Sequence, residues 1–291
     1  MAHLPSRSVA HEDDTLIVVP ARHPLRWIAA ALIAVVAFSF IRLVAINPNF
    51  QWDVVGKYLF SPVVLKGLGL TLWLTVVTMA IGVILGIVLA VMKLSDNILI
   101  RGASESFLWF FRGTPVLVQI IFWYNLAALF PRYTIGIPFG PTFFEGSIND
   151  LITPYTAAIL ALGLNEGAYM AEIVRAGILS VGPEQRDAAR ALGMTRRKTM
   201  IRIILPQAMR FIVPPTGNQT IGMLKTTSLV SVVALSDLLY SVQSIYSRTY
   251  ETIPLLIVAC VWYLVATSIL TLGQTRLERV FGKGRRPQGG A

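Results

Sequence analysis

A series of long apolar runs is the feature that most constrains how this chain folds. An α-helix needs about 20 predominantly apolar residues to cross a bilayer. Six runs have about this length, and the fifth is more polar than the others. Their residue ranges are 27–46, 65–92, 107–130, 155–179, 208–235 and 253–272. The sequence therefore predicts an all-α, polytopic membrane protein with six transmembrane helices.

The composition excludes several other classes of protein. Of the 291 residues, 55% are hydrophobic and only 14% are charged, whereas soluble domains carry roughly 25% charged residues. The net charge of +10 comes from short clusters between the apolar runs. No basic and aromatic strand pattern accompanies these clusters, which argues against nucleic-acid binding. With one cysteine, Cys260, the chain can form neither an intrachain disulfide nor a cysteine-based metal cluster.

The distribution of Lys and Arg predicts the orientation. With the N-terminus inside, 17 of the 25 basic residues face the cytoplasm, three face outside, and five lie within or beside the spans. Because cytoplasmic loops carry the excess of basic residues, we expect both termini in the cytoplasm. The first run lacks a cleavage-site pattern, which predicts an uncleaved helix at 26–46 after a disordered cytoplasmic tail at 1–25. A basic cytoplasmic tail is expected at 276–291, disordered from 284.

The segment 182–206 differs from the other loops. Helix-forming residues flank Gly193 on both sides, and Pro183 suits the first turn of a helix. The stretch from Glu184 to Arg210 has a net charge of +5. The pattern predicts two short helices joined at the glycine. Such a hairpin is consistent either with a membrane-surface element held by anionic lipid or with a docking element for a cytosolic partner.

This segment carries a resemblance to a known family. Permease subunits of ABC importers have a cytoplasmic EAA loop, with the pattern E-A-A, three residues, G, nine residues, then I-x-L-P. Asp187-Ala188-Ala189, Gly193 and Ile203-Ile204-Leu205-Pro206 follow that spacing. The chain departs from the pattern at Asp187, which replaces the usual glutamate. The loop thus resembles the EAA loop of these inner-membrane permeases.

Further motifs resemble the polar amino acid subfamily, the histidine, glutamine, arginine and opine permeases. These motifs are Lys66-Gly67-Leu68 with Thr71, Phe111-Arg112-Gly113-Thr114-Pro115 with Gln119, Ala168-Tyr169-Met170-Ala171-Glu172-Ile173 with Arg175, Leu205-Pro206-Gln207-Ala208, and Lys225-Thr226-Thr227-Ser228-Leu229. The resemblance covers about residues 62–275 and implies a permease core domain there. It implies five core helices, to which the helix at 26–46 is an addition.

The resemblance also implies partners. A permease of this type works with two ATPase subunits, a second permease chain, which is the same or homologous, and an external amino-acid-binding protein. The amino acid and membrane lipid are its small-molecule contacts. The chain has no G-x-x-x-x-G-K-[ST] loop, so we expect ATP and Mg²⁺ on the partner ATPase, no cofactor on this chain, and no enzymatic activity of its own. The implied function is import by alternating access.

By family match, the ATPase-coupling residues are Glu184, Asp187, Ala188, Ala189 and Gly193. The alanines would allow close approach to a groove, and the glycine a sharp turn between two helices. The alternative is an ordinary hairpin on the membrane surface.

Glu166 lies near the middle of the fourth run. An ionisable group there is expensive unless it faces a polar cavity or a partner. It either contacts the substrate or pairs with Lys225 or Arg175, and the sequence does not choose between these. Glu172 and Arg175 are three residues apart, which favours a structural ion pair on one helix face.

The polar fifth run, with Pro214-Pro215 inside it, predicts a broken helix that lines the translocation path; a hinge is the alternative. Candidates for the substrate path are Glu166, Tyr169, Asn218, Gln219, Lys225, Thr226, Thr227 and Ser228. Candidates for a gate are Arg112, Thr114 and Pro115, where a proline favours a kink. Gly82 and Gly86 form a G-x-x-x-G pair, for which helix packing within the subunit is favoured over a dimer contact.

Two other functions compete. In an ion-coupled secondary transporter, Glu166 and Lys225 would form a relay, but such transporters usually contain internal repeats, and the chain shows no convincing one. A channel or membrane enzyme is the third option. Against an enzyme, the spans hold no carboxylate pair beside a nucleophile.

Overall fold

The computed structural model describes residues 24–137 and 141–282, and it divides into two units that meet at Phe50. The first unit contains helix α1 (Pro24–Ile46) and the short 3-10 helix η1 (Pro48–Phe50). Along α1 the apolar side chains are exposed, as expected of a helix that faces lipid. The helix agrees with the predicted span at 26–46. The predicted tails lie largely outside the described residues.

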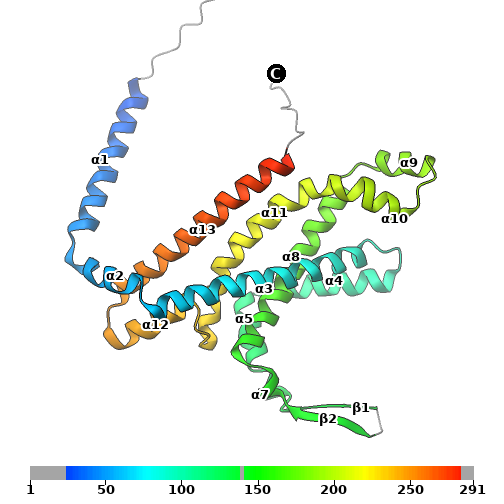
Figure 1. Ribbon diagram of the computed structural model, residues 1–291, viewed down its shortest axis with the longest axis horizontal. Helices are drawn as coiled ribbons and strands as arrows, with labels where there is room; N and C mark the ends of the chain where they lie inside the picture. The colour runs from blue at the N-terminus through cyan, green and yellow to red at the C-terminus, as the bar shows by residue number, and fades with distance from the viewer. Residues whose placement is uncertain (1–23, 138–140, 283–291) are drawn as a thin grey trace, which may run out of the picture. The chain divides into compact units, whose positions relative to one another are not determined.

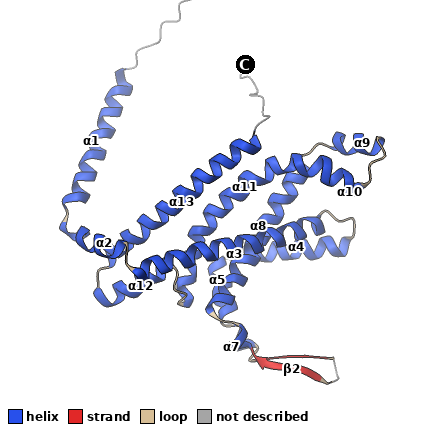
Figure 2. Cartoon of the chain, viewed as in Figure 1, coloured by secondary structure: helices blue, strands red, loops and turns tan. Residues whose placement is uncertain are grey.

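The second unit is helical except for one hairpin in its described part (Figures 1 and 2). It begins with α2 (Trp52–Leu59) and α3 (Pro62–Lys93). The Ser61 side chain caps α3 by accepting from the backbone N–H of Val64, and Pro62 occupies the first turn, where a missing N–H does no harm. The second predicted span is thus a single long helix.

The kink predicted at Pro115 is present, and it divides the third predicted span. Residues 107–130 fall on α4 (Ile98–Gly113), α5 (Val116–Tyr124) and α6 (Leu126–Leu129), and α4 and α5 meet at an angle of 100°. The break falls at Thr114 and Pro115, because proline cannot donate the backbone hydrogen bond that would continue α4.

A β-hairpin follows, which the all-α prediction did not include. Strands β1 (Arg132–Gly136) and β2 (Thr142–Ser147) pair antiparallel, with Ile135 opposite Phe144 and Arg132 opposite Ser147. An ion pair of 3.0 Å joins Arg132 Nη1 to Glu145 Oε1. The short helix α7 (Ile148–Leu151) then leads into α8 (Pro154–Leu179), which starts with a capping box formed by Thr153 and Thr156.

Helices α3 and α8 form the most extensive helix pair of the described chain, and glycines allow their close approach. A Cβ atom on Gly82 would lie 2.5 Å from Glu166 Cγ, and one on Gly86 would lie 2.5 Å from Met170 Cβ. From the other helix, Gly167 faces Leu85 in the same way. The G-x-x-x-G pair is therefore a packing motif within the subunit, as predicted.

The chain continues through α9 (Pro183–Ala191), α10 (Arg196–Thr199), the π-helical segment η2 (Met200–Ile204) and α11 (Leu205–Thr226). The 3-10 segment η3 (Thr227–Val233) and α12 (Leu238–Thr249) follow, and α12 is bent by 45° from the preceding helices. The predicted break at Pro214-Pro215 is wrong, because α11 runs through both prolines. The helix instead ends at Thr226, before the end of the predicted span at 208–235.

Helix α13 (Thr252–Gly282) completes the described chain. One buried apolar cluster lies between α3, α5, α8 and α11, and another between α2, α3, α12 and α13. Four helices are individually long and apolar enough to cross a membrane, and each of the two bent pairs could supply a further span. The structure is thus a helical membrane protein with four to six candidate spans.

Candidate functional site

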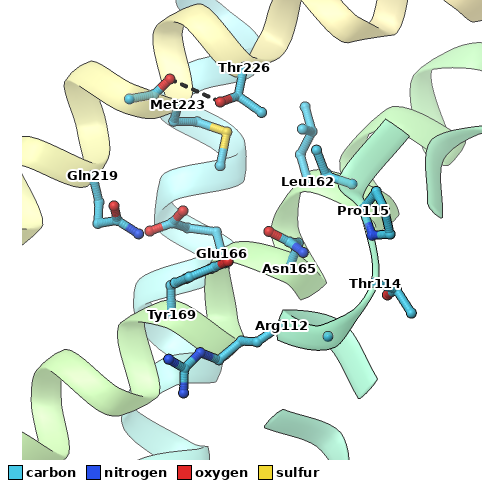
Figure 3. A pocket seen from close by; sticks show the side chains of 13 residues that line it. Arg112, Thr114, Pro115, Leu162, Asn165, Glu166, Tyr169, Gln219, Met223 and Thr226 are labelled. Atoms are coloured by element: carbon cyan, nitrogen blue, oxygen red, sulfur yellow. Dashed lines mark hydrogen bonds between the residues drawn. The ribbon is translucent and has the colours of Figure 1, made fainter. Parts of the chain in front are cut away.

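A cavity of about 510 Å³ lies where the α4–α5 break meets α8 and α11 (Figure 3). Its lining is mixed: a carboxylate, an arginine, amide and hydroxyl side chains, and a few apolar groups. The lining residues are Arg112, Gly113, Thr114, Pro115, Val116, Leu162, Asn165, Glu166, Tyr169, Gln219, Gly222, Met223 and Thr226.

The structure brings seven of the predicted path and gate residues to this cavity. From α8 come Glu166 and Tyr169, and from α11 come Gln219 and Thr226. The three gate candidates Arg112, Thr114 and Pro115 form the wall opposite. Candidate residues predicted from the third, fourth and fifth apolar runs therefore line the same cavity.

Glu166 is the buried carboxylate of this cavity, with 4% of its surface exposed. It is held against Gly82 on α3, and the Gln219 side chain of α11 lies beside it in the cavity lining (Figure 3). Its Oε1 atom has no hydrogen-bond partner within the described chain. Neither Lys225 nor Arg175 pairs with it: Lys225 is exposed and Arg175 contacts Glu172. Within the described residues, the Glu166 carboxylate therefore has no cationic partner.

The break between α4 and α5 is stabilised by side-chain amides. Pro115 lacks the N–H that would bond the carbonyl of Phe111, four residues before it. Two side chains replace that donor: Gln119 Nε2 donates to Phe111 O at 3.0 Å, and Asn165 Nδ2 donates to the same oxygen at 2.7 Å. Gln119 Nε2 also donates to Thr114 Oγ1 at 2.8 Å. Since Asn165 precedes Glu166 on α8, the break is bonded directly to the helix that carries the carboxylate.

A cluster of charges borders the cavity at Glu172, about 1.7 turns further along α8 than Glu166. Glu172 Oε1 lies 2.6 Å from Lys93 Nζ and 3.3 Å from Arg112 Nη1. The Oε2 atom lies 2.8 Å from Arg175 Nε, which is the predicted pair. The Arg112 guanidinium also stacks 5.4 Å from the centre of the Tyr169 ring. One carboxylate therefore joins the ends of α3 and α4 to α8.

Four predicted path residues lie elsewhere. Asn218 Oδ1 accepts a hydrogen bond of 2.9 Å from Gln274 on α13, and Lys225 is exposed. The hydroxyl groups of Thr227 and Ser228 bond to backbone oxygens of Leu224 and Lys225, which is ordinary helical back-bonding. These residues do not line the cavity.

The sequence reasoning missed Asn165, although it is a polar side chain at mid-span directly before Glu166. That position was the available signal. It also missed the apolar lining residues Leu162 and Met223. Neither is polar, so the available signal was only their helical spacing of four residues from Glu166 and from Gln219.

The segment 182–206 forms the predicted pair of short helices joined at Gly193. Gly193 has φ +70° and closes α9 with two hydrogen bonds: its N–H donates to Arg190 O at 2.9 Å, and the N–H of Met194 donates to Ala189 O at 3.0 Å. This is a Schellman ending, which favours glycine because an L side chain is strained there. Of the predicted coupling residues, Glu184, Asp187 and Ala188 are exposed, and Ala189 is buried.

Comparison with known proteins identifies the family. A family model described as binding-protein-dependent transport system inner membrane component matches residues 82–282. The chain belongs to this family. As an inner membrane component of such a system, it is a transport component rather than an enzyme.

Two relatives and one solved structure resemble this inner membrane component over most of its length. The chain is 46% identical to an arginine transport system permease protein of Corynebacterium glutamicum, over 91% of this chain and 83% of the relative. It is 32% identical to a glutamine transport system permease protein of Escherichia coli, over 79% of this chain and 97% of the relative. A crystal structure titled as an amino acid ABC transporter with histidines matches with a TM-score of 0.64 and 38% identity, over 76% of this chain and 94% of that one.

Proposed function

We propose that this chain is the transmembrane permease subunit of an ABC importer that carries a polar amino acid across the bacterial inner membrane by alternating access. The names of the relatives support the substrate class, since they are permeases of arginine and glutamine transport systems. The cavity at the α4–α5 break is the observation that carries the proposal. Its volume of about 510 Å³ lies within the range of small-molecule sites, roughly 300–1,000 Å³.

The cavity offers complementary groups to an amino acid. Glu166 would attract an ammonium or other cationic group of the substrate, because its carboxylate lines the cavity and has no cationic partner within the described residues. Asn165, Gln219 and Thr226 provide hydrogen-bonding groups beside it. Movement at the α4–α5 break, next to Arg112, would open and close this space. The substrate path and the gate would thus share this one cavity.

The partners follow from the same assignment. Two ATPase subunits would dock on the α9–α10 hairpin and bind ATP and Mg²⁺, an external binding protein would deliver the amino acid, and a second permease chain would complete the pathway. The α9–α10 hairpin and the β1–β2 hairpin lie at opposite ends of α8 (Figure 1). With six spans and the basic segments inside, both termini and the α9–α10 hairpin would be cytoplasmic. Family membership disfavours the ion-coupled secondary transporter.

Gly193 gives a sharp test of coupling. We expect Gly193→Trp to lose ATP-driven uptake and retention of the ATPase during co-purification. Gly193→Ala is the matched control, because it places the same backbone strain at φ +70° without bulk, and no atom lies within 4 Å of the added Cβ. Equal, near-normal uptake in both variants would show that the hairpin does not dock the ATPase.

Glu166 tests the substrate path separately. Glu166→Gln keeps the size of the side chain and removes its charge, so we expect uptake of a cationic amino acid to fall by roughly tenfold or more while the complex still assembles. Glu105→Gln, on the exposed face of α4, is the matched control. Normal uptake by Glu166→Gln would remove this carboxylate from the path without affecting the coupling assignment.

A further inference from the structure

A second cavity lies at the base of the α9–α10 hairpin, away from the substrate cavity. Its volume is about 340 Å³. The end of α3, the end of α8, both hairpin helices and η2 contribute to it. The lining residues are Leu94, Asp96, Ile178, Arg186, Arg190, Met194, Arg196, Thr199, Met200 and Ile204.

The charges of this lining are unbalanced. Three guanidinium groups, from Arg186, Arg190 and Arg196, face one carboxylate, Asp96. That carboxylate makes only a long, exposed ion pair, since Arg196 Nη1 lies 4.0 Å from Asp96 Oδ2. Arg190 has a second acidic neighbour outside the lining, because its Nη1 lies 3.6 Å from Asp187 Oδ1. Both pairs are exposed and long, so they contribute little. The lining therefore keeps an excess of positive charge.

Arg186 is fixed in this lining and still has a donor to spare. Its Nη2 donates to Ile178 O at 3.1 Å, which satisfies a carbonyl in the last turn of α8. Its Nε is buried and has no hydrogen-bond partner within the described residues. A buried guanidinium N–H without an acceptor is costly. The Ile178 carbonyl therefore fixes Arg186 in the lining, and no carboxylate of the described residues pairs with its guanidinium group.

The rest of the lining is apolar. Leu94 directly follows α3 and Ile178 lies in the last turn of α8, while Met194, Met200 and Ile204 come from the hairpin and η2. Guanidinium groups beside an apolar wall suit a phosphate, whose oxygens accept from the planar arginine fork. The apolar wall would additionally suit the acyl chains of a phosphate-bearing lipid.

We propose that this cavity is a phosphate-binding site, filled either by the headgroup of an anionic phospholipid or by free phosphate. A phosphate here would bridge Arg186 and Arg190 on α9 to Arg196 on α10, across the Gly193 turn. It would thereby hold the two helices of the hairpin in a fixed relation to the ends of α3 and α8. The assignment does not depend on which solute the permease carries.

The test is a binding titration of the full-length permease in delipidated detergent micelles by isothermal titration calorimetry. The probes are inorganic phosphate, short-chain phosphatidic acid, and short-chain phosphatidylcholine as the lipid without net charge. We expect Arg196→Gln to weaken binding of a phosphate probe by roughly tenfold, the loss of one charge-assisted contact. Asp96→Asn removes the carboxylate that competes for Arg196, so it should tighten binding by roughly threefold.

Arg197→Gln is the matched control, because Arg197 is the next residue, is exposed and does not line the cavity. Its affinity should stay near that of the wild type.

Binding of phosphatidic acid alone would identify the lipid as the source, and equal binding of inorganic phosphate would identify the free ion. Absence of binding by both probes, or equal loss in Arg196→Gln and Arg197→Gln, would overturn the proposal. So would unchanged phosphate binding in Arg196→Gln together with loss of the ATPase on co-purification, since the arginines would then serve the protein partner.

Discussion

Gly82 provides the space in which Glu166 is held, and this contact can be tested with one methyl group. In Gly82→Ala the new Cβ would lie 2.5 Å from Glu166 Cγ and 2.8 Å from its Cβ, so α3 and α8 must separate. We expect the variant to lose about 1–3 kcal/mol of stability, the usual effect of overpacking, and to lose uptake. Gly69→Ala on the same helix has no atom within 4 Å of the new Cβ and should unfold at the wild-type temperature in detergent. Identical unfolding temperatures for both variants would contradict the close packing.

The lining residues of the cavity were predicted from their polarity, and the face of α11 on which each residue lies was not considered. Gln219, Gly222, Met223 and Thr226 follow the spacing i, i+3, i+4 and i+7, so they share one face of α11. Asn218 is one residue, about 100° of rotation, away from Gln219 and so bonds to α13. A list based on polar residues therefore collected two faces, and it omitted Gly222 and Met223 because neither is polar.

The α4–α5 break depends on Gln119, which is buried with 4% of its surface exposed. Its amide donates to the Phe111 and Thr114 carbonyl oxygens and to the Thr114 hydroxyl. Gln119→Leu would leave buried acceptors with fewer donors, so we expect a loss of about 1–3 kcal/mol of stability. Thermal unfolding in detergent would measure it, with Gln243→Leu on an exposed position of α12 as the control. If the two variants unfold alike, the amide does not hold the break.

The sequence predicted straight helices better than bent ones. Apolar length alone predicts α3, α8 and α13, because a helix that spans a bilayer needs that length whatever surrounds it. It does not report that α4 and α5 meet at 100°, since the break depends on donors such as Asn165, 54 residues away from Phe111. The pair Glu172–Arg175 was predicted because its residues are three apart on one helix. The pair Lys93–Glu172 was not predicted, because its residues are 79 apart in the sequence and lie on different helices. Contacts between helices require the fold to be known first.

For the whole molecule, the division at Phe50 separates α1 from every buried apolar cluster of the described chain. Stability should then reside in the second unit, while α1 adds one apolar run flanked on its N-terminal side by Arg22 and Arg26. Deletion of residues 1–46 should leave the unfolding temperature in detergent nearly unchanged.

Because basic residues near the first helix usually set orientation, the truncated chain should insert less uniformly. Trypsin cleavage at Arg196, Arg197 and Lys198, compared between right-side-out and inside-out vesicles, would measure this. A truncated chain that fails to insert or unfolds at a much lower temperature would show that α1 is part of the folded core.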